Sequence, residues 1–118
     1  MNKVTIIGGS GFVGSRLIEL LNSNIKISNF DKNPSLKFAD ITTIGDVRNF
    51  KEVTNIIKGS NTIVLLAAEH RDDVSPTSLY YDVNVLGVKN VVKAMDQENV
   101  RNIIFTSSVA VYGLNKNN

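Results

Sequence analysis

Short apolar runs alternate with amphipathic stretches along the whole chain. Strands are predicted at 3–7, 25–30, near 40–44, 62–66 and 102–107, and helices at 12–22, 49–58 and 76–97. Several strand runs, such as IVLL at 63–66 and IIF at 103–105, do not alternate with polar residues. That pattern is typical of strands buried on both faces of a parallel sheet. Right-handed crossovers then predict an α/β fold, an open doubly wound parallel sheet in the order 3-2-1-4-5.

The first strand leads through the glycine-rich segment GGSGFVG into the first helix. Gly8 and Gly11 lack a Cβ, so they permit a tight turn and a close approach of the backbone to a ligand, and Gly14 permits close packing of the helix. The helix begins with Phe12 and Val13, whose free N–H groups and positive dipole end favour phosphate. A glycine triplet alone also occurs in ordinary loops, but this one lies between a readable strand and a readable helix. The turn is therefore predicted to hold a dinucleotide pyrophosphate.

The second predicted strand is followed by an acid, Asp31. At the carboxyl end of that strand, a carboxylate can accept hydrogen bonds from adenosine ribose hydroxyls and repel a 2′-phosphate, which favours NAD as the cofactor. The alternative is a solvated turn acid, because Asp-Lys-Asn-Pro is also good turn chemistry. A P-loop is excluded, since Ser15 stands where its lysine is required.

Composition and charge narrow the class of protein. The 118 residues suffice for one domain, and 13 Lys and Arg against 11 Asp and Glu give a net charge of +2. The signs are interspersed without a basic cluster, so no nucleic-acid partner is expected. The chain has no cysteine, which excludes thiolate metal sites and fits a reducing cytoplasm. No apolar run is long enough to cross a bilayer and no signal peptide is recognisable, so we expect no membrane association.

Taken together, the motifs resemble the extended short-chain dehydrogenase/reductase family, the NAD-carrying nucleotide-sugar epimerases and dehydratases. The resemblance covers nearly the whole chain, and each motif has its proper place in the order of strands and helices. It implies that residues 1–118 are a partial NAD-binding domain with a Rossmann-like doubly wound sheet. The domain would be truncated after the fifth strand, before the family's catalytic Tyr-x-x-x-Lys helix and substrate-binding part. Besides GGSGFVG and Asp31, it rests on GDVR at 45–48, VLLAAEH at 64–70, YYDVNVLGVKNVV at 80–92 and FTSSVAVYG at 105–113.

The resemblance implies further cofactor contacts. Asp46 and Val47 match the family's adenine contact, although Asp46 could instead cap the helix at 49–58. Leu66, Ala67 and Ala68 end the fourth strand, where small side chains leave room for the cofactor, although such residues also simply pack.

Three polar residues follow from the same resemblance. Asn84 matches an asparagine that holds the strand end and the active-site region, and Thr106 lies beside the cofactor. The single histidine, His70, is either solvated or within reach of a ribose. No other residue is spaced to bind a metal with it, so no metal site is expected.

The segment FTSSVAVYG is expected to supply one catalytic group, a serine hydroxyl, but not the general base. By register, Ser108 matches the family's catalytic hydroxyl, which hydrogen-bonds the reacting sugar oxygen; the alternative is a serine that satisfies backbone groups at the strand end. Tyr112 and Lys116 have the spacing of the family's tyrosine–lysine pair, but they follow Ser108 too closely, and Gly113 and several asparagines disfavour a helix. We interpret that match as a coincidence.

The helix at 76–97 is apolar on two flanks of a narrow polar stripe, more than one sheet face requires. It is either wedged within its own domain or shared with a second subunit, and the resemblance implies a homodimer. We expect one flank of this helix to be exposed and to associate with other apolar surfaces. That flank is formed by Tyr81, Val85, Val88 and Val92.

Two functions remain open. The first is the NAD-binding portion of a nucleotide-sugar epimerase or dehydratase that acts by transient hydride transfer to NAD. The second is a non-catalytic NAD(P)-binding or sensing module on the same scaffold.

Overall fold

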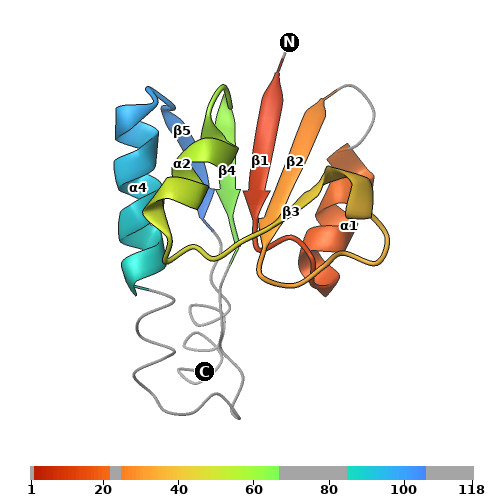
Figure 1. Ribbon diagram of the computed structural model, residues 1–118. Coiled ribbons are helices and arrows are strands. Elements are labelled where there is room, and N and C mark those ends of the chain that lie inside the picture. The colour runs from red at the N-terminus through yellow and green to blue at the C-terminus, as the bar shows by residue number, and fades with distance from the viewer. Residues whose placement is uncertain (1, 22–24, 67–84, 106–118) are drawn as a thin grey trace, which may run out of the picture.

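The computed structural model describes residues 2–21, 25–66 and 85–105. Five parallel strands form one sheet in the order β3-β2-β1-β4-β5 (Figure 1). The predicted fold class and strand order are therefore confirmed. The strands are β1 (Lys3–Ile7), β2 (Lys26–Asp31), β3 (Thr42–Ile44), β4 (Thr62–Leu65) and β5 (Asn102–Phe105).

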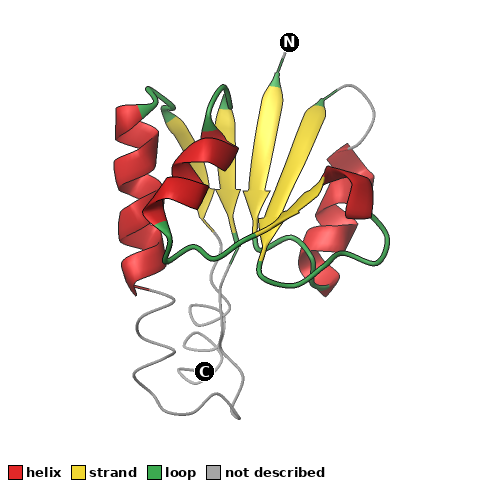
Figure 2. Ribbon diagram, in the orientation of Figure 1, coloured by secondary structure: helices red, strands yellow, loops and turns green. Residues whose placement is uncertain are grey.

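Helices flank the sheet, as the secondary-structure view shows (Figure 2). The helix α1 (Phe12–Leu21) follows β1, α2 (Phe50–Ile57) follows β3, and α4 (Gly87–Gln97) precedes β5; a short 3-10 helix, η1 (Ala39–Ile41), leads into β3. Within the parts of the chain that the structure describes, no helix is long and apolar enough to span a bilayer.

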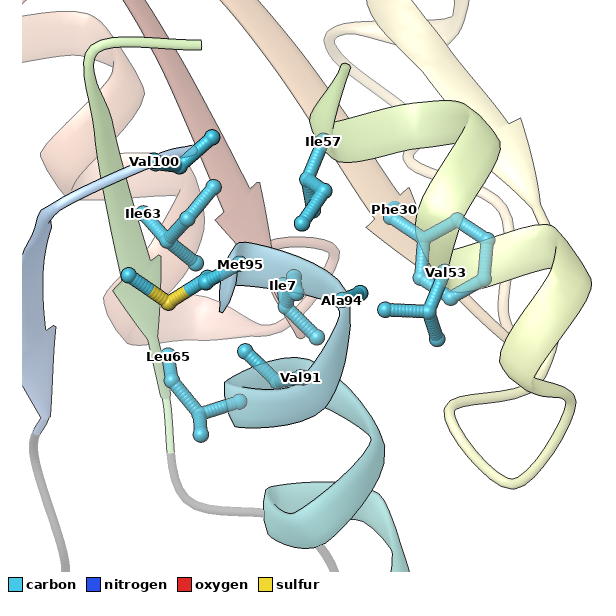
Figure 3. Packing of buried hydrophobic residues seen from close by; sticks show 10 residues of the cluster. All are labelled: Ile7, Phe30, Val53, Ile57, Ile63, Leu65, Val91, Ala94, Met95 and Val100. Atoms are coloured by element: carbon cyan, nitrogen blue, oxygen red, sulfur yellow. The ribbon is translucent and has the colours of Figure 1, made fainter. Parts of the chain in front are cut away.

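Each face of the sheet carries its own apolar cluster. On one face, α2 and α4 pack over the strands, with their side chains directed into the cluster shown in Figure 3. That cluster contains Ile7, Phe30, Val53, Ile57, Ile63, Leu65, Val91, Ala94, Met95 and Val100. The other face is covered by α1, through Ile18, and the cluster there also contains Val4, Ile6, Ile27, Val64 and Leu66. The central strands β1 and β4 contribute to both clusters, which explains their continuous apolar sequences.

The fifth strand differs from expectation. Ile103, Ile104 and Phe105 are 41%, 55% and 57% exposed, so the prediction of burial on both faces is wrong for β5 within the described residues. Among the strands of the described residues, β5 is the last in the order and pairs with β4 alone, so it lies at an edge of the sheet.

The predicted helix 76–97 is seen only in part, because residues 76–84 lie outside the described residues. In α4, Val91, Ala94 and Met95 are buried, and Val88 is half-buried against the core. The prediction that Val88 belongs to an exposed flank is therefore wrong. Val92 is 53% exposed, as expected. A helix with two apolar flanks does not reveal from its sequence which flank faces the sheet.

Candidate functional site

The glycine turn leaves β1 at the carboxyl edge of the sheet, where the arrowheads of all the strands lie (Figure 1). Gly8 has φ +90°, a conformation that side chains rarely adopt. Its N–H donates to the Phe30 carbonyl at 2.7 Å, which ties the turn to β2. A Cβ at Gly14 would lie 2.4 Å from Gly9 Cα, so α1 packs directly against the turn. Both residues are glycine for reasons internal to the fold.

Gly11 is a glycine for a different reason. A Cβ added there would meet nothing within 4 Å, so the fold itself does not require a glycine at this position. The Gly11 carbonyl accepts the first helical hydrogen bond, from Ser15 N at 2.9 Å. The open space beside Gly11 is where the sequence predicts the closest approach of a pyrophosphate.

The first turn of α1 follows Gly11 directly. The helix begins at Phe12, and the N–H groups of Phe12 and Val13 precede its first helical donor, Ser15. Such amides have no partner within their own helix, and they favour an anion. The side chains of Phe12 and Val13 are 84% and 67% exposed, so they leave this end of the helix open.

Asp31 is brought directly against the glycine turn. One carboxylate oxygen accepts the Ser10 N–H at 2.9 Å, and the other accepts the Asn33 N–H at 2.9 Å. The turn-acid interpretation is thus realised, since both oxygens bind turn amides. Each oxygen keeps a second lone pair for a ribose hydroxyl. The structure therefore joins the two sequence signals for a dinucleotide, and it fixes the orientation of the carboxylate.

Asp46 follows β3 at the same edge of the sheet. Its carboxylate accepts hydrogen bonds from the Arg48 backbone N at 2.9 Å and from the Arg48 Nη2 at 2.7 Å. The hydrogen bond from Arg48 holds the pKa of Asp46 below its usual value, while partial burial opposes the shift. A carboxyl group whose pKa is lowered in the folded state stabilises the fold above its unfolded-state pKa, and this contribution is lost as the pH falls through the folded-state pKa. The Asp46–Arg48 pair therefore persists into acid solution.

The alternative that Asp46 caps the second helix is wrong. The N-cap of α2 is Asn49, whose side-chain oxygen accepts the Glu52 N–H at 3.1 Å. Asn49 immediately precedes the helix, whereas Asp46 lies one turn too early to reach its free amides. The capping role therefore belongs to Asn49, and the adenine contact of Asp46, whose two carboxylate oxygens both accept hydrogen bonds from Arg48, stays a prediction.

Val47 is held in place by α4. Its carbonyl accepts a hydrogen bond from Asn90 Nδ2 at 2.9 Å. A Cβ at Gly87 would lie 2.7 Å from Val47 Cγ2, so the start of α4 contacts this loop directly. The loop predicted to contact adenine is thus fixed by a helix distant in sequence.

Leu66 was interpreted either as a residue that borders the cofactor or as a packing residue, and the structure supports parts of both interpretations. Its side chain is buried in the α1-side cluster, as simple packing predicts. Its N–H donates to the Ile7 carbonyl at 3.0 Å, and its carbonyl oxygen would lie 3.5 Å from a Cβ at Gly8. The Leu66 Cβ is equally close to the turn, at 3.6 Å from the same position, so both the backbone and the base of the side chain border Gly8.

Several predicted residues lie outside the described residues, and their roles stay predictions. They are Ala67, Ala68, His70, Asn84, Thr106, Ser108, Tyr112 and Lys116.

Asn29 is a site residue that the sequence analysis missed. It is fully buried in β2, and its side-chain oxygen accepts the Gly9 N–H at 2.9 Å. A Cβ at Gly9 would lie 2.3 Å from that oxygen, so Gly9 is needed as well. The signal in the sequence was an amide inside the second predicted strand, two positions before Asp31. With a period of two, both side chains lie on one face of β2.

Comparison with known proteins decides the family. The model of the 3-beta hydroxysteroid dehydrogenase/isomerase family matches residues 5–118. The chain belongs to this family. Among curated relatives, it is 59% identical over 117 residues to an Escherichia coli O157:H7 protein named N-acetyl-alpha-D-glucosaminyl-diphospho-ditrans,octacis-undecaprenol 4-epimerase. It is 32% identical over 115 residues to the human decarboxylating sterol-4-alpha-carboxylate 3-dehydrogenase.

This family member covers only part of the length of those two relatives. The matches span 99% of the chain but 35% of the E. coli protein, and 92% of the chain but 30% of the human protein. The chain thus spans about a third of the length of the curated relatives it matches.

Solved structures share the fold of this family member. UDP-glucose 4-epimerase from Bifidobacterium longum, in complex with NAD⁺ and UDP, superimposes with a TM-score of 0.79 at 26% identity, covering 95% of this chain and 38% of that one. An NAD-bound short-chain dehydrogenase/reductase superfamily protein from Agrobacterium tumefaciens gives a TM-score of 0.80 at 21% identity, covering 88% and 32%. The resemblance to the short-chain dehydrogenase/reductase proteins is confirmed.

Proposed function

We propose that this chain is the NAD-binding portion of a sugar epimerase or dehydratase. The observation that carries the proposal is the hydrogen bond from Ser10 N to the Asp31 carboxylate, at 2.9 Å. It joins the glycine turn, suited to a pyrophosphate, to an acid suited to a ribose, at the edge of the sheet where such folds bind ligands. The NAD in the compared Bifidobacterium structure supports the same cofactor.

Different residues of this chain are proposed to contact different parts of the cofactor. The amides of Phe12 and Val13 and the open space at Gly11 suit the pyrophosphate, the Asp31 carboxylate suits the adenosine ribose, and the Asp46–Val47 loop suits adenine. When bound, NAD supplies a transient acceptor and donor of hydride. Ser108 is proposed to hydrogen-bond the sugar oxygen that loses and regains a proton.

The substrate proposed is a hexose carried on a diphosphate. A nucleotide sugar is one form, and the UDP in the compared Bifidobacterium epimerase supports it. The name of the E. coli relative describes a sugar diphosphate carried on undecaprenol, which supports a lipid-linked form of the same headgroup. A cytoplasmic location belongs to this proposal, supported by a sequence without cysteine.

Preference for NAD over NADP is expected to depend on Asp31. Because Ser10 and Asn33 hold its two oxygens, the carboxylate cannot turn away from a 2′-phosphate. Asp31→Asn removes the charge but keeps an amide oxygen for one turn N–H. We expect Asp31→Asn to reduce the ratio of the NADP dissociation constant to the NAD dissociation constant roughly tenfold, a change of the size that loss of a hydrogen bond to a charged group produces. Titration calorimetry with NAD and NADP measures the ratio. An unchanged ratio in Asp31→Asn would remove the ribose role.

The non-catalytic module is the second candidate, and turnover separates it from the enzyme. We expect no activity from this chain alone, because a serine hydroxyl is a poor base without a partner. Fusion of residues 1–118 to the remaining part of the E. coli relative is expected to restore epimerisation of N-acetylglucosamine diphosphates. Ser108→Ala should then slow the fusion about 10²–10³-fold, the usual loss for one hydrogen bond to a reacting oxygen. A fusion that folds and binds NAD without turnover would favour the module.

Self-association through α4 is also proposed. Val92 in α4 is 53% exposed, and Val85, two residues before the helix begins, is 39% exposed, which supports an apolar contact between two copies. Val92→Glu is expected to keep the chain monomeric in sedimentation experiments. Gln97→Glu, an exposed change on the same helix with the same charge difference, should leave association unchanged. A wild-type chain that stays monomeric at high concentration would contradict the proposal.

A further inference from the structure

Asn29 places a polar side chain in the buried interior of the sheet. It lies in β2 between Ile27, which is buried in the α1-side cluster, and Asp31 on the same strand face. Asn29 is 0% exposed, and a buried amide without partners is costly. An apolar side chain at this position would avoid the cost of burying an amide. The amide therefore needs a reason beyond packing.

The reason is visible in its hydrogen bonds. The Asn29 side-chain oxygen accepts the Gly9 N–H at 2.9 Å, and its Nδ2 donates to Ser10 Oγ at 3.2 Å and to Thr42 Oγ1 at 3.0 Å. Two of the three bonds reach consecutive residues of the glycine turn. The third reaches the neighbouring strand β3.

Two hydroxyls extend this network outward. Ser10 Oγ donates to the Asn33 carbonyl at 2.8 Å, and Thr42 Oγ1 donates to the Phe38 carbonyl at 2.7 Å. Each hydroxyl thus accepts from Asn29 and passes its own proton on, so every donor has an acceptor. Chains of this kind strengthen one another in a buried setting.

The geometry points to Asn29 as a positioning residue for the cofactor. By holding Gly9 and Ser10 against β2, it fixes the turn from which the open site at Gly11 and the free amides of α1 follow. It also sets Ser10 N against the Asp31 carboxylate. The inference rests on the proposed NAD-binding function, and it deepens that function by assigning the rigidity of the pyrophosphate subsite to one buried amide.

The consequence is a selective loss of affinity. Asn29→Leu removes both bonds to the turn, so NAD, which needs the turn for its pyrophosphate, should bind about tenfold more weakly or worse. Adenosine has no phosphate and reaches only the Asp31 and Asp46 side of the site. The Asn33 N–H still holds the Asp31 carboxylate there, at 2.9 Å, so the affinity for adenosine should change little. A merely structural role would weaken both ligands equally.

Ser10→Ala is a milder variant that keeps the proposal testable where Asn29→Leu fails to fold. It removes only the hydroxyl between Asn29 and Asn33, at a half-buried position. We expect a smaller loss of NAD affinity in the same direction, again without loss of adenosine affinity.

Thr5→Val is the matched control. Thr5 is also fully buried, but its hydroxyl bonds Ser60 Oγ at 2.6 Å and the Ile56 carbonyl at 3.4 Å, away from the turn. Thr5→Val therefore removes a buried polar group and its two hydrogen bonds from β1. We expect lower stability and unchanged affinity for both ligands.

The experiment titrates NAD and adenosine into the 118-residue wild type and the three variants, with binding followed by amide NMR shifts and folding by urea denaturation. NAD weakened in Asn29→Leu and Ser10→Ala, with adenosine and Thr5→Val unaffected, supports the assignment. Unchanged NAD affinity in both turn variants overturns it, as does an equal loss for both ligands. A wild type that binds no NAD defeats the proposed function itself, and the wild-type titration shows that outcome separately.

Discussion

Gly14→Ala is expected to lower the free energy of unfolding by about 2 kcal/mol or more. The new Cβ would lie 2.4 Å from Gly9 Cα and 2.5 Å from the Gly9 carbonyl oxygen, where backbone cannot rotate away. Overpacking of this kind typically costs about 1–3 kcal/mol and sometimes more, whereas the gain in helix propensity from glycine to alanine is about 1 kcal/mol. Urea denaturation followed by circular dichroism measures the difference.

Gly11→Ala is the control for that result. It adds the same methyl group three residues earlier, where nothing lies within 4 Å, so only a small capping loss is expected. Equal stability of the Gly14→Ala variant and the wild type would mean that α1 does not pack against the turn as the structure has it.

Gly11→Val is expected to weaken NAD binding roughly 10–100-fold while the chain stays folded, since the cost of overpacking then falls on the complex. The isopropyl group would occupy the open space beside Gly11 from which a pyrophosphate approaches the free amides of α1. Titration calorimetry with NAD gives the dissociation constant.

Gly11→Ala again serves as the comparison, because it shares the loss of a capping glycine but fills less of the space. Its NAD affinity should fall between those of the wild type and Gly11→Val. If Gly11→Val is stable and binds NAD as tightly as the wild type, the pyrophosphate does not lie beside Gly11.

The glycine turn was predictable because its signals are local. A strand, a segment with four glycines and a helix in immediate succession predict their own geometry, and the positive φ of Gly8 and the contact of Gly14 agree with it. The order of the sheet was predictable for a similar reason, since alternating strands and helices leave few right-handed arrangements.

What the sequence could not reveal depends on direction and on neighbours. Val88 and Val92 look alike in sequence, and only the packing of α4 on the sheet distinguishes the half-buried residue from the exposed one. Asn29 has no local partner, because its bonds reach the turn before α1 and the strand after η1. The apolar residues of β5 fit a central strand, yet β5 is the last in the order.

The most direct test of NAD binding at this edge is the map of backbone amide shifts in ¹⁵N NMR spectra as NAD is added. The account predicts that the largest shifts fall on the turn from Gly8 to Val13, on Asp31, and on the Asp46–Val47 loop. Amides at the opposite edge, such as those of Lys3 and Asn61, should stay unchanged; Lys3 N there donates to Asn61 Oδ1 at 2.7 Å. Saturating shifts confined to that opposite edge, or no shifts at millimolar NAD, would contradict the assignment of the dinucleotide site.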